Sequence, residues 1–359
     1  MSVDLLYGEA EEDLRGALRA LLEQRAAWPA VLARTESAQW CDAGLWRVLA
    51  GDIGVAGLAV PQELGGAGAS WREAAVVAEE LGRAVAPVPF LGSAVMATAA
   101  LLACGETQVL PGLAAGEATA AVAVPFSTAP GAPYPASVAV SGGLLTGQVR
   151  SVADALVADV FLVPAGGGLY AVDAAALRRT PVTSLDMTRP LCDLEFAGVA
   201  GRLVDSGEGA LRAALAIGAA LLASEQLGLA ERCLETTVSY VRTRYQFARP
   251  VGSYQGLKHR LADLWVAITQ ARAVARYAAG CAASGDPDTA VAVAVAQAHC
   301  SQVVVRAAEE CVQMHGGIGF TWEHPAHLYL KRAKSTAIAL GTADRHRAAL
   351  SALVDLPGR

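Results

Sequence analysis

The sequence lacks the signatures of several common enzyme classes. It contains no G-x-x-x-x-G-K-[ST] phosphate loop, no G-x-S-x-G nucleophile turn and no complete G-x-G-x-x-G run. These absences argue against nucleotide hydrolysis, serine esterase chemistry and a dinucleotide-binding Rossmann domain. The chemistry of the chain must therefore be sought in other polar segments.

Paired cysteines and a basic leader are also missing. The seven cysteines are scattered and form no C-x-x-C pair, which indicates reduced core thiols rather than a disulfide framework or a zinc site. The first residues, MSVDLLYGEAEEDLR, are acidic where an export signal is basic. We therefore expect a cytoplasmic protein.

Positive charge is scarce. The 28 Lys and Arg residues face 34 Asp and Glu residues, giving a net charge of −6, and no basic block interrupts the chain. This charge balance argues against a nucleic-acid partner.

The uncharged stretch from 84 to 105 has the length of a membrane span, but Pro87, Pro89 and Gly92 break it. A buried helix is the better interpretation, so we expect no membrane insertion.

The chain of 359 residues, 54% hydrophobic, is long enough for two or three domains. Residues 1–118 are predicted to be helical, because Leu14, Leu18 and Leu21 recur at helical spacing and residues 71–85 form an amphipathic run. Residues 119–204 shift to short Val-rich runs separated by Gly, Pro and Ser, which predicts antiparallel strands.

Long helical patterns return in residues 205–359. The run AALAIGAALLAS at 213–224 is apolar on every face and belongs inside a bundle. Further helices are predicted at 254–284, 288–314 and 325–339. The predicted fold class is therefore α+β, with an N-terminal helical domain, a middle antiparallel β domain and a C-terminal four-helix bundle.

One polar segment, RTRYQFARPVGSYQGLKHRLAD at 242–263, gathers arginines around a Pro-Gly turn. Arg242, Arg244 and Arg249 lie close to Phe247 and Tyr254. Guanidinium groups beside an aromatic ring suit a planar, phosphate-bearing ligand. A solvated helix end explains the same arginines, because cations complement the helix dipole there.

A second polar segment follows a predicted helix at 311–335. Gly316 and Gly317 fit a helix C-cap, but they also let a ligand approach the backbone beside Gln313 and His315. Nearby, Glu323, His324 and His327 invite a metal site. Pro325 and the lack of a third spaced ligand argue against it, so we predict no metal.

Together these segments resemble the acyl-CoA dehydrogenase family along the whole chain. The similarity is seen in GVAGLAVPQELGGAG with AEELGRA, in SLDMTRPLCDLEFAGV at 184–199, and most specifically in RYQFARPVGSYQ at 244–255 and QMHGGIGFTWEHPAHLYLKRA at 313–333. The resemblance implies FAD and an acyl-CoA thioester. In the family, a carboxylate removes the α-proton while the β-hydrogen leaves as hydride to the flavin.

The resemblance also assigns cofactor-binding residues. Those expected to hold the pyrophosphate and adenine end of FAD are Arg244, Phe247, Gln255, Gln313, Gly316 and Gly317, with Thr342 kept from the motif that carries the base. In the family such residues reach a flavin seated mainly in the neighbouring subunit. This chain therefore retains the half of the site that it lends to a partner.

The half that the chain would keep for itself departs from the family pattern. Residues 123–133, AVPFSTAPGAP, replace a T-E-x-x-x-G-S-D-like loop, and Ser151-Val152-Ala153 replaces a Trp-Ile/Ser-Thr triplet. IALGTADRHR at 338–347 aligns with the Tyr-Glu-Gly-Thr motif, which places Leu340 at the catalytic glutamate. Leucine does not accept a proton.

Other positions offer few replacements for the base. Some family members carry it on the helix before the arginine motif, at the position of Gly218. Glu225 lies two helical turns further on the same face, although capping or pairing with an arginine explains it more simply. Asp344 is a weaker candidate still.

Three hypotheses follow. The first is a subunit of a heterotetrameric α2β2 acyl-CoA dehydrogenase that lacks a base, completes the FAD site of a homologous subunit carrying the glutamate, and acts on bulky, steroid-type CoA esters with an electron-transfer flavoprotein. The second is a self-sufficient dehydrogenase or related flavoenzyme with an unconventional base such as Glu225. The third is a non-enzymatic acyl-CoA-binding or scaffold protein.

Overall fold

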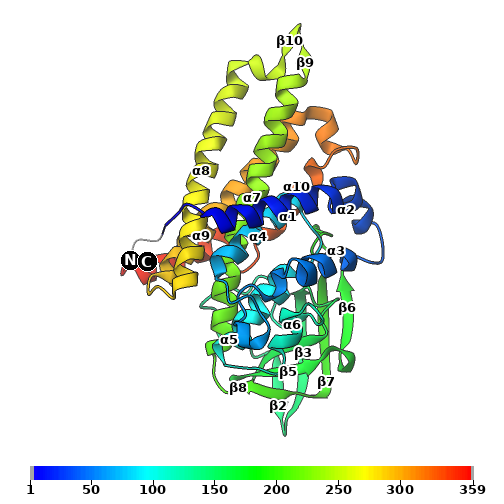
Figure 1. Cartoon of the computed structure of the whole chain (residues 1–359), viewed down its shortest axis with the longest axis vertical. Helices are drawn as coiled ribbons and strands as arrows, with labels where there is room; N and C mark the ends of the chain where they lie inside the picture. The colour runs from blue at the N-terminus through cyan, green and yellow to red at the C-terminus, as the bar shows by residue number, and fades with distance from the viewer. Residues whose placement is uncertain (1–3, 357–359) are drawn as a thin grey trace.

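The computed structural model describes residues 4–356 and confirms the α+β fold class. Helices precede and follow a β domain, and the longest helices project away from it (Figure 1). One hydrophobic core runs through both helical parts, whereas the β domain has a core of its own. The two ends of the chain therefore pack together into one body.

The N-terminal part is built from short helices. They are α1 (Glu9–Arg25), α2 (Trp28–Thr35), α3 (Ala43–Arg47), α4 (Trp71–Ala84), α5 (Thr98–Ala103) and α6 (Leu110–Ala114). Helix α4 starts with a capping box: the Ser70 hydroxyl accepts a hydrogen bond from the Arg72 N–H, and the Glu73 carboxylate accepts one from the Ser70 N–H. Most of the uncharged stretch at 84–105 is buried, as predicted, and it forms a π-helical segment (Phe90–Ala97) that continues into α5.

The β domain is a sandwich of two four-stranded sheets. Its strands are β1 (Ala120–Val122), β2 (Val138–Ser141), β3 (Leu144–Ala153), β4 (Val160–Ala165), β5 (Gly168–Asp173), β6 (Arg178–Val182), β7 (Leu191–Ala200) and β8 (Arg202–Asp205). The order is β1-β4-β5-β8 in one sheet and β2-β3-β7-β6 in the other. Phe161 and Phe196 fill the space between them.

One pairing in the sandwich corrects the sequence prediction of antiparallel strands. Strand β1 pairs with β4 in parallel, with Ala120 opposite Val160. Between β1 and β4 the chain forms β2 and β3, which belong to the other sheet. Strand β4 then runs beside β1 in the same direction. All other pairings in the sandwich are antiparallel.

The C-terminal part consists of long helices and a small hairpin. They are α7 (Gly209–Thr243), β9 (Tyr245–Gln246), β10 (Arg249–Pro250), α8 (Gln255–Ser284), α9 (Thr289–His315), α10 (Ala326–Thr336) and α11 (Ala343–Leu353). Two helical segments, Gly209–Thr243 and Thr289–Phe320, are long and apolar enough to cross a membrane. However, 83% and 61% of their apolar windows are buried inside the structure, as in core helices.

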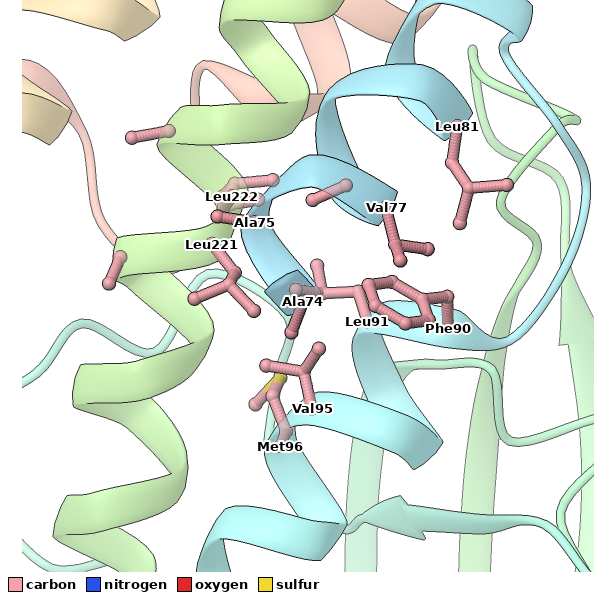
Figure 2. Packing of buried hydrophobic residues seen from close by; sticks show 14 of the residues in the cluster. Ala74, Ala75, Val77, Leu81, Phe90, Leu91, Val95, Met96, Leu221 and Leu222 are labelled. Carbon is pink, nitrogen blue, oxygen red and sulfur yellow. The ribbon is translucent and has the colours of Figure 1, made fainter. Parts of the chain in front are cut away.

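The crossing of α4 and α7 ties the N-terminal part to the bundle. A Cβ atom added at Gly228 would lie 1.9 Å from the Glu79 carbonyl oxygen, and one added at Gly82 would lie 2.2 Å from the Glu225 carbonyl oxygen. Glycine on both helices therefore lets the two backbones touch. Figure 2 shows apolar packing between α4 and its neighbours, with Leu221 of α7 beside Ala74 and with Phe90 and Leu91 below Val77.

Candidate cofactor and catalytic sites

A pocket lies where α7, α8 and α9 meet the β9–β10 hairpin. Its volume is about 680 Å³, and its walls include Arg244, Gln313, Gly316 and Gly317. The structure thus brings together four of the residues assigned to the cofactor from the sequence. Figure 1 places this end of α7 and the hairpin far from the β domain.

Local backbone geometry explains how Arg244 reaches this pocket. Helix α7 ends at Thr243, and Arg244 is extended, with φ −77° and ψ 123°. The chain then turns through Phe247 and Ala248, which have φ values of 51° and 61° and join β9 to β10. Positive φ at two successive residues is typical of a type I′ hairpin turn, and neither residue here is glycine. This strained turn reverses the chain immediately beyond the pocket.

The charge of the pocket suits an anion. Arg244 and Arg260 lie in its walls, and no Asp or Glu side chain of residues 4–356 does. Arg260 pairs with Glu310 at 2.7 Å, whereas Arg244 has no ion-pair partner among the described residues. A free guanidinium can therefore bind phosphate oxygens through two hydrogen bonds.

Phe247, Arg249, Tyr254 and Gln255 of the arginine segment do not line the pocket. Phe247 is 89% exposed at the tip of the hairpin, and Gln255 is exposed at the start of α8. Arg249 instead stacks over the Tyr254 ring, with its guanidinium carbon 3.7 Å from the ring centre. Phe247 and Gln255 are therefore exposed outside the pocket.

Thr342 lies in a different place. Its hydroxyl accepts a hydrogen bond from the Arg345 N–H and caps α11, and it borders a separate groove between α9 and α11. Asp344 is exposed and pairs with Arg347 at 2.8 Å. The structure therefore does not bring Thr342 to the pocket of Arg244, and Asp344 faces no closed site.

The two positions expected to carry a catalytic base meet each other. Leu340 is fully buried, and a Cβ atom added at Gly218 would lie 3.2 Å from its Cδ1 atom and 2.7 Å from Cγ of Met96. The backbone N–H of Leu340 donates to the carbonyl oxygen of Phe126 at 2.7 Å. Both positions are apolar: Leu340 lies against the β-domain loop of residues 123–133, and Gly218 lies against Met96 and Leu340.

A small cavity remains beside Leu340. It holds about 10 Å³, and Met96, Val124, Phe126 and Asp154 are among the residues that line it. That volume accommodates about one water molecule. Neither a flavin ring nor an acyl chain fits in this cavity.

Asp154 is a buried carboxylate that the sequence interpretation missed. It lines the cavity of Leu340, and its Oδ2 atom accepts a hydrogen bond from the Gly92 N–H at 2.9 Å. Burial raises the pKa of Asp154, although Arg189 and the Gly92 N–H oppose the change. The sequence offered one indication of this residue: Asp154 directly follows Ser151-Val152-Ala153, the segment that aligns with a flavin contact of the family.

Glu225 forms ion pairs rather than facing the cavity. Its carboxylate pairs with Arg189 at 2.5 Å and with Arg332 at 3.2 Å, and all three side chains are buried. Burial alone raises the pKa of Glu225, but the two guanidinium groups outweigh it, so the pKa is lowered. The pairing with arginine that explained Glu225 most simply is thus present, and a carboxylate held in this way is a poor base.

Arg332 also joins the three parts of the chain. It pairs with Asp186 at 3.2 Å, and it donates to the carbonyl oxygens of Thr188 and Ala86. Helix α10, the loop before β7, α7 and the N-terminal part therefore meet at one buried cluster. Its charges hold the domains together.

The histidines at 324 and 327 pack against aromatic rings. The His324 ring lies 4.1 Å from that of His315, and the His327 ring lies 4.6 Å from that of Trp322. Within residues 4–356, no group of three or more His, Cys, Asp or Glu side chains is arranged to hold a metal ion.

Comparison with known proteins gives the family. The family model described as acyl-CoA dehydrogenase, N-terminal domain, matches residues 8–117, and that described as acyl-CoA dehydrogenase, C-terminal domain, matches residues 205–354. The acyl-CoA dehydrogenase IpdE2 of Mycolicibacterium smegmatis is 38% identical over 333 residues, which are 93% of this chain and 95% of that protein.

Solved structures agree with this assignment. A chain of the ChsE4–ChsE5 complex from Mycobacterium tuberculosis is 28% identical, with a TM-score of 0.89 over 99% of this chain and 100% of its own. A chain of the Tcur3481–Tcur3483 steroid ACAD is 30% identical, with a TM-score of 0.86 over 97% of this chain and 98% of its own. The family is generally FAD-dependent. By sequence and by fold, this chain belongs to the acyl-CoA dehydrogenase family of oxidoreductases.

Proposed function

We propose that this chain is the base-less subunit of a heteromeric, FAD-dependent acyl-CoA dehydrogenase. The observation that carries the proposal is the contrast between its two sites. The pocket of Arg244 and Gly316 is about 680 Å³, whereas the cavity beside Leu340 is about 10 Å³. In this proposal, the pocket of Arg244 contributes to the cofactor site of a neighbouring subunit. The cavity beside Leu340, where this chain's own flavin and substrate would bind, is filled by side chains.

In this proposal, Arg244, Gln313, Gly316 and Gly317 hold the pyrophosphate and adenine end of FAD. The Arg244 guanidinium pairs with phosphate oxygens, and the two glycines let the ligand approach the end of α9. When bound, the flavin supplies the acceptor for the hydride that leaves the β-carbon. The α-proton goes to a glutamate of the partner subunit, because this chain has no free carboxylate at either expected position.

The proposed partner is a homologous subunit carrying that glutamate, and the contact is the end of the C-terminal bundle. Phe247 on the hairpin and Phe320 and Trp322 after α9 are 89%, 75% and 59% exposed. Large apolar side chains exposed beside a polar pocket mark an interaction surface. We place the resulting α2β2 complex in the cytoplasm, with an electron-transfer flavoprotein as its electron acceptor.

For the substrate, we propose the CoA thioester of a bulky, steroid-type acyl group. Two solved structures similar to this chain support both the substrate and the assembly, since one is a two-component steroid ACAD and the other is a complex of two named chains. The partner subunit would hold the acyl group, because the cavity beside Leu340 does not accommodate it.

The first test is the visible spectrum and native mass of the chain, alone and after co-expression with a homologous subunit that carries the glutamate. A colourless chain and a yellow complex, with about one flavin per two chains, would support the proposal. A chain that is yellow alone and bleaches with an acyl-CoA would overturn it. In that case the base would be Asp154, the only carboxylate that lines the cavity within the described residues.

A further inference from the structure

Another pocket lies between the N-terminal helices and the bundle. Its volume is about 170 Å³, and its walls come mainly from α1, α4, α7 and α10, which run close together near the centre of Figure 1. None of its residues lines the pocket of Arg244 or the cavity beside Leu340. The pocket is therefore separate from the proposed cofactor site.

Three arginines lie in the walls of this pocket, and two of them are already paired. Arg19 donates two hydrogen bonds to Glu80, at 2.6 and 3.0 Å. Arg83 donates two hydrogen bonds to Glu235, at 2.6 and 3.0 Å. Each of these guanidinium groups thus has a carboxylate of the protein as its partner.

The third arginine, Arg232, has no carboxylate partner. It is half-buried on α7, and within residues 4–356 no carboxylate lies at ion-pair distance from it. Its Nε atom donates to the Tyr329 hydroxyl at 3.4 Å. The Nη1 and Nη2 atoms make no hydrogen bond to the described residues, yet they are not sealed from solvent.

This half-buried position makes Arg232 a strong candidate to bind an anion. Burial removes part of the water around the guanidinium and lowers the local dielectric, so an anion is attracted more strongly there than at the open surface. Two carboxylates also line the pocket, but Glu80 is neutralised by its arginine partners and Glu23 is exposed. Arg232 therefore remains the unpaired charge of the wall.

The rest of the wall is largely apolar. It is formed by Leu22, Ala26, Ala27, Trp28, Ala84 and Tyr329. An apolar cavity of about 150 Å³ holds one benzene ring, so this pocket has room for a body of that size. An unpaired guanidinium beside such walls suits a ligand with one charged end and one apolar end.

We propose that this pocket binds a small monocarboxylate with a flat, apolar body. The two carboxylate oxygens accept hydrogen bonds from Nη1 and Nη2 of Arg232, because the planar guanidinium matches a carboxylate in a bidentate pair. The body of the ligand lies against Leu22 and Ala26. A bound ligand touches helices of both helical parts of the chain, so it stabilises the folded state. The inference does not depend on the proposed function, since neither site of that proposal takes part.

The test uses the full chain and benzoate as the probe. Calorimetry gives the affinity and the number of sites, and thermal unfolding gives the change in Tm. Benzamide keeps the ring without the charge, and acetate keeps the charge without the ring. We expect benzoate to bind at one site per chain and to raise Tm, and each of the other two to bind at least about tenfold more weakly.

Two variants locate the site. Arg232→Gln removes the proposed cation and is expected to weaken benzoate binding by about tenfold or more. Its matched control is Arg242→Gln, because Arg242 is exposed on the same helix and does not line the pocket. Ala27→Leu changes an exposed residue of the wall, so it narrows the pocket with little risk to folding and is also expected to weaken binding.

Several outcomes would overturn this inference. If benzamide binds as tightly as benzoate, or if Arg232→Gln keeps the wild-type affinity, Arg232 does not anchor a carboxylate. If acetate binds as tightly as benzoate, or if Ala27→Leu binds as the wild type does, the apolar walls do not hold the ligand. If millimolar benzoate does not bind, the pocket is no site for this class of ligand. The comparison of the three probes uses the wild-type chain alone, so it needs no variant to fold.

Discussion

At the scale of single residues, burial distinguishes the structural charge of Glu225 from the free charge of Arg244. Glu225 is buried between Arg189 and Arg332, and each carboxylate oxygen has a cationic partner. Arg244 is exposed at a pocket wall and has no such partner among the described residues. The first charge belongs to the fold, and the second is free for a ligand.

Replacing Arg244 by Ala is expected to weaken retention of flavin by the complex by about tenfold or more, because a charge-assisted, bidentate contact with phosphate is lost. The measurement is the ratio of flavin to protein after gel filtration. Arg242→Ala is the matched control, since Arg242 is exposed on α7 but does not line the pocket. Unchanged flavin content in Arg244→Ala would show that this residue does not hold the cofactor.

Replacing Glu225 by Gln is expected to lower the free energy of unfolding by about 3 kcal/mol at neutral pH, since Arg189 and Arg332 lose their shared buried partner. Glu235→Gln, on the same helix, removes a half-exposed ion pair with Arg83 and is expected to cost less than about 1 kcal/mol. Urea titration measures both. If the two variants lost equal free energies of unfolding, burial would not be the reason that the Glu225 ion pairs stabilise the fold.

The effect of Glu225 also depends on pH. Its folded-state pKa is lowered, so its stabilisation is complete above the ordinary value of 4.5 and is lost as pH falls through the folded pKa. The stability gap between wild type and Glu225→Gln is therefore expected to shrink below about pH 4.5. A gap that widens with acid would mean that the carboxylate is not the charged partner.

Replacing Leu340 by Glu is not expected to create dehydrogenase activity in the lone chain. The new carboxylate would lie in a cavity of about 10 Å³ among apolar side chains, with no room for substrate or flavin. The assay is acyl-CoA-dependent dye reduction by the purified variant without a partner. Measurable turnover would refute the interpretation of this cavity as a filled site.

At the scale of helices and strands, close contact between α4 and α7 depends on two glycines. Gly228→Ala would force α7 away from the Glu79 carbonyl oxygen. We expect it to lower the free energy of unfolding by about 2 kcal/mol or more, as measured by thermal unfolding. Gly256→Ala on α8 is the matched control, because nothing lies within 4 Å of its added Cβ atom. The control is expected to leave stability unchanged or to raise it slightly.

The elements also show what the sequence can predict. The segments RYQFARP and HGGIG each follow directly after a long helix, and their resemblance to the family motifs was enough to assign Arg244 and Gly316 to one site. Glu225 pairs with residues 36 and 107 positions away, and Asp154 meets Gly92 from 62 positions away. Such contacts depend on how whole domains pack. The parallel pairing of β1 with β4 was missed for the same reason.

At the scale of the whole molecule, a core shared by the two helical parts leaves the hairpin of Phe247 projecting from the bundle. Phe247→Ala is therefore expected to leave the stability of the lone chain unchanged but to weaken its association with the partner subunit. Sedimentation of a co-expressed pair measures this. Leu203→Ala, a half-exposed apolar residue on β8, is the control that should not affect association.

The exposed rings of Phe247, Phe320 and Trp322 have a consequence inside a cell. A copy of this chain that has not found its partner keeps these apolar surfaces in water, where chaperones and proteases act on exposed hydrophobic segments. Its lifetime would then depend on how soon it is covered. We expect the amount of this chain to follow the amount of its partner, so that deleting the partner's gene would deplete both proteins.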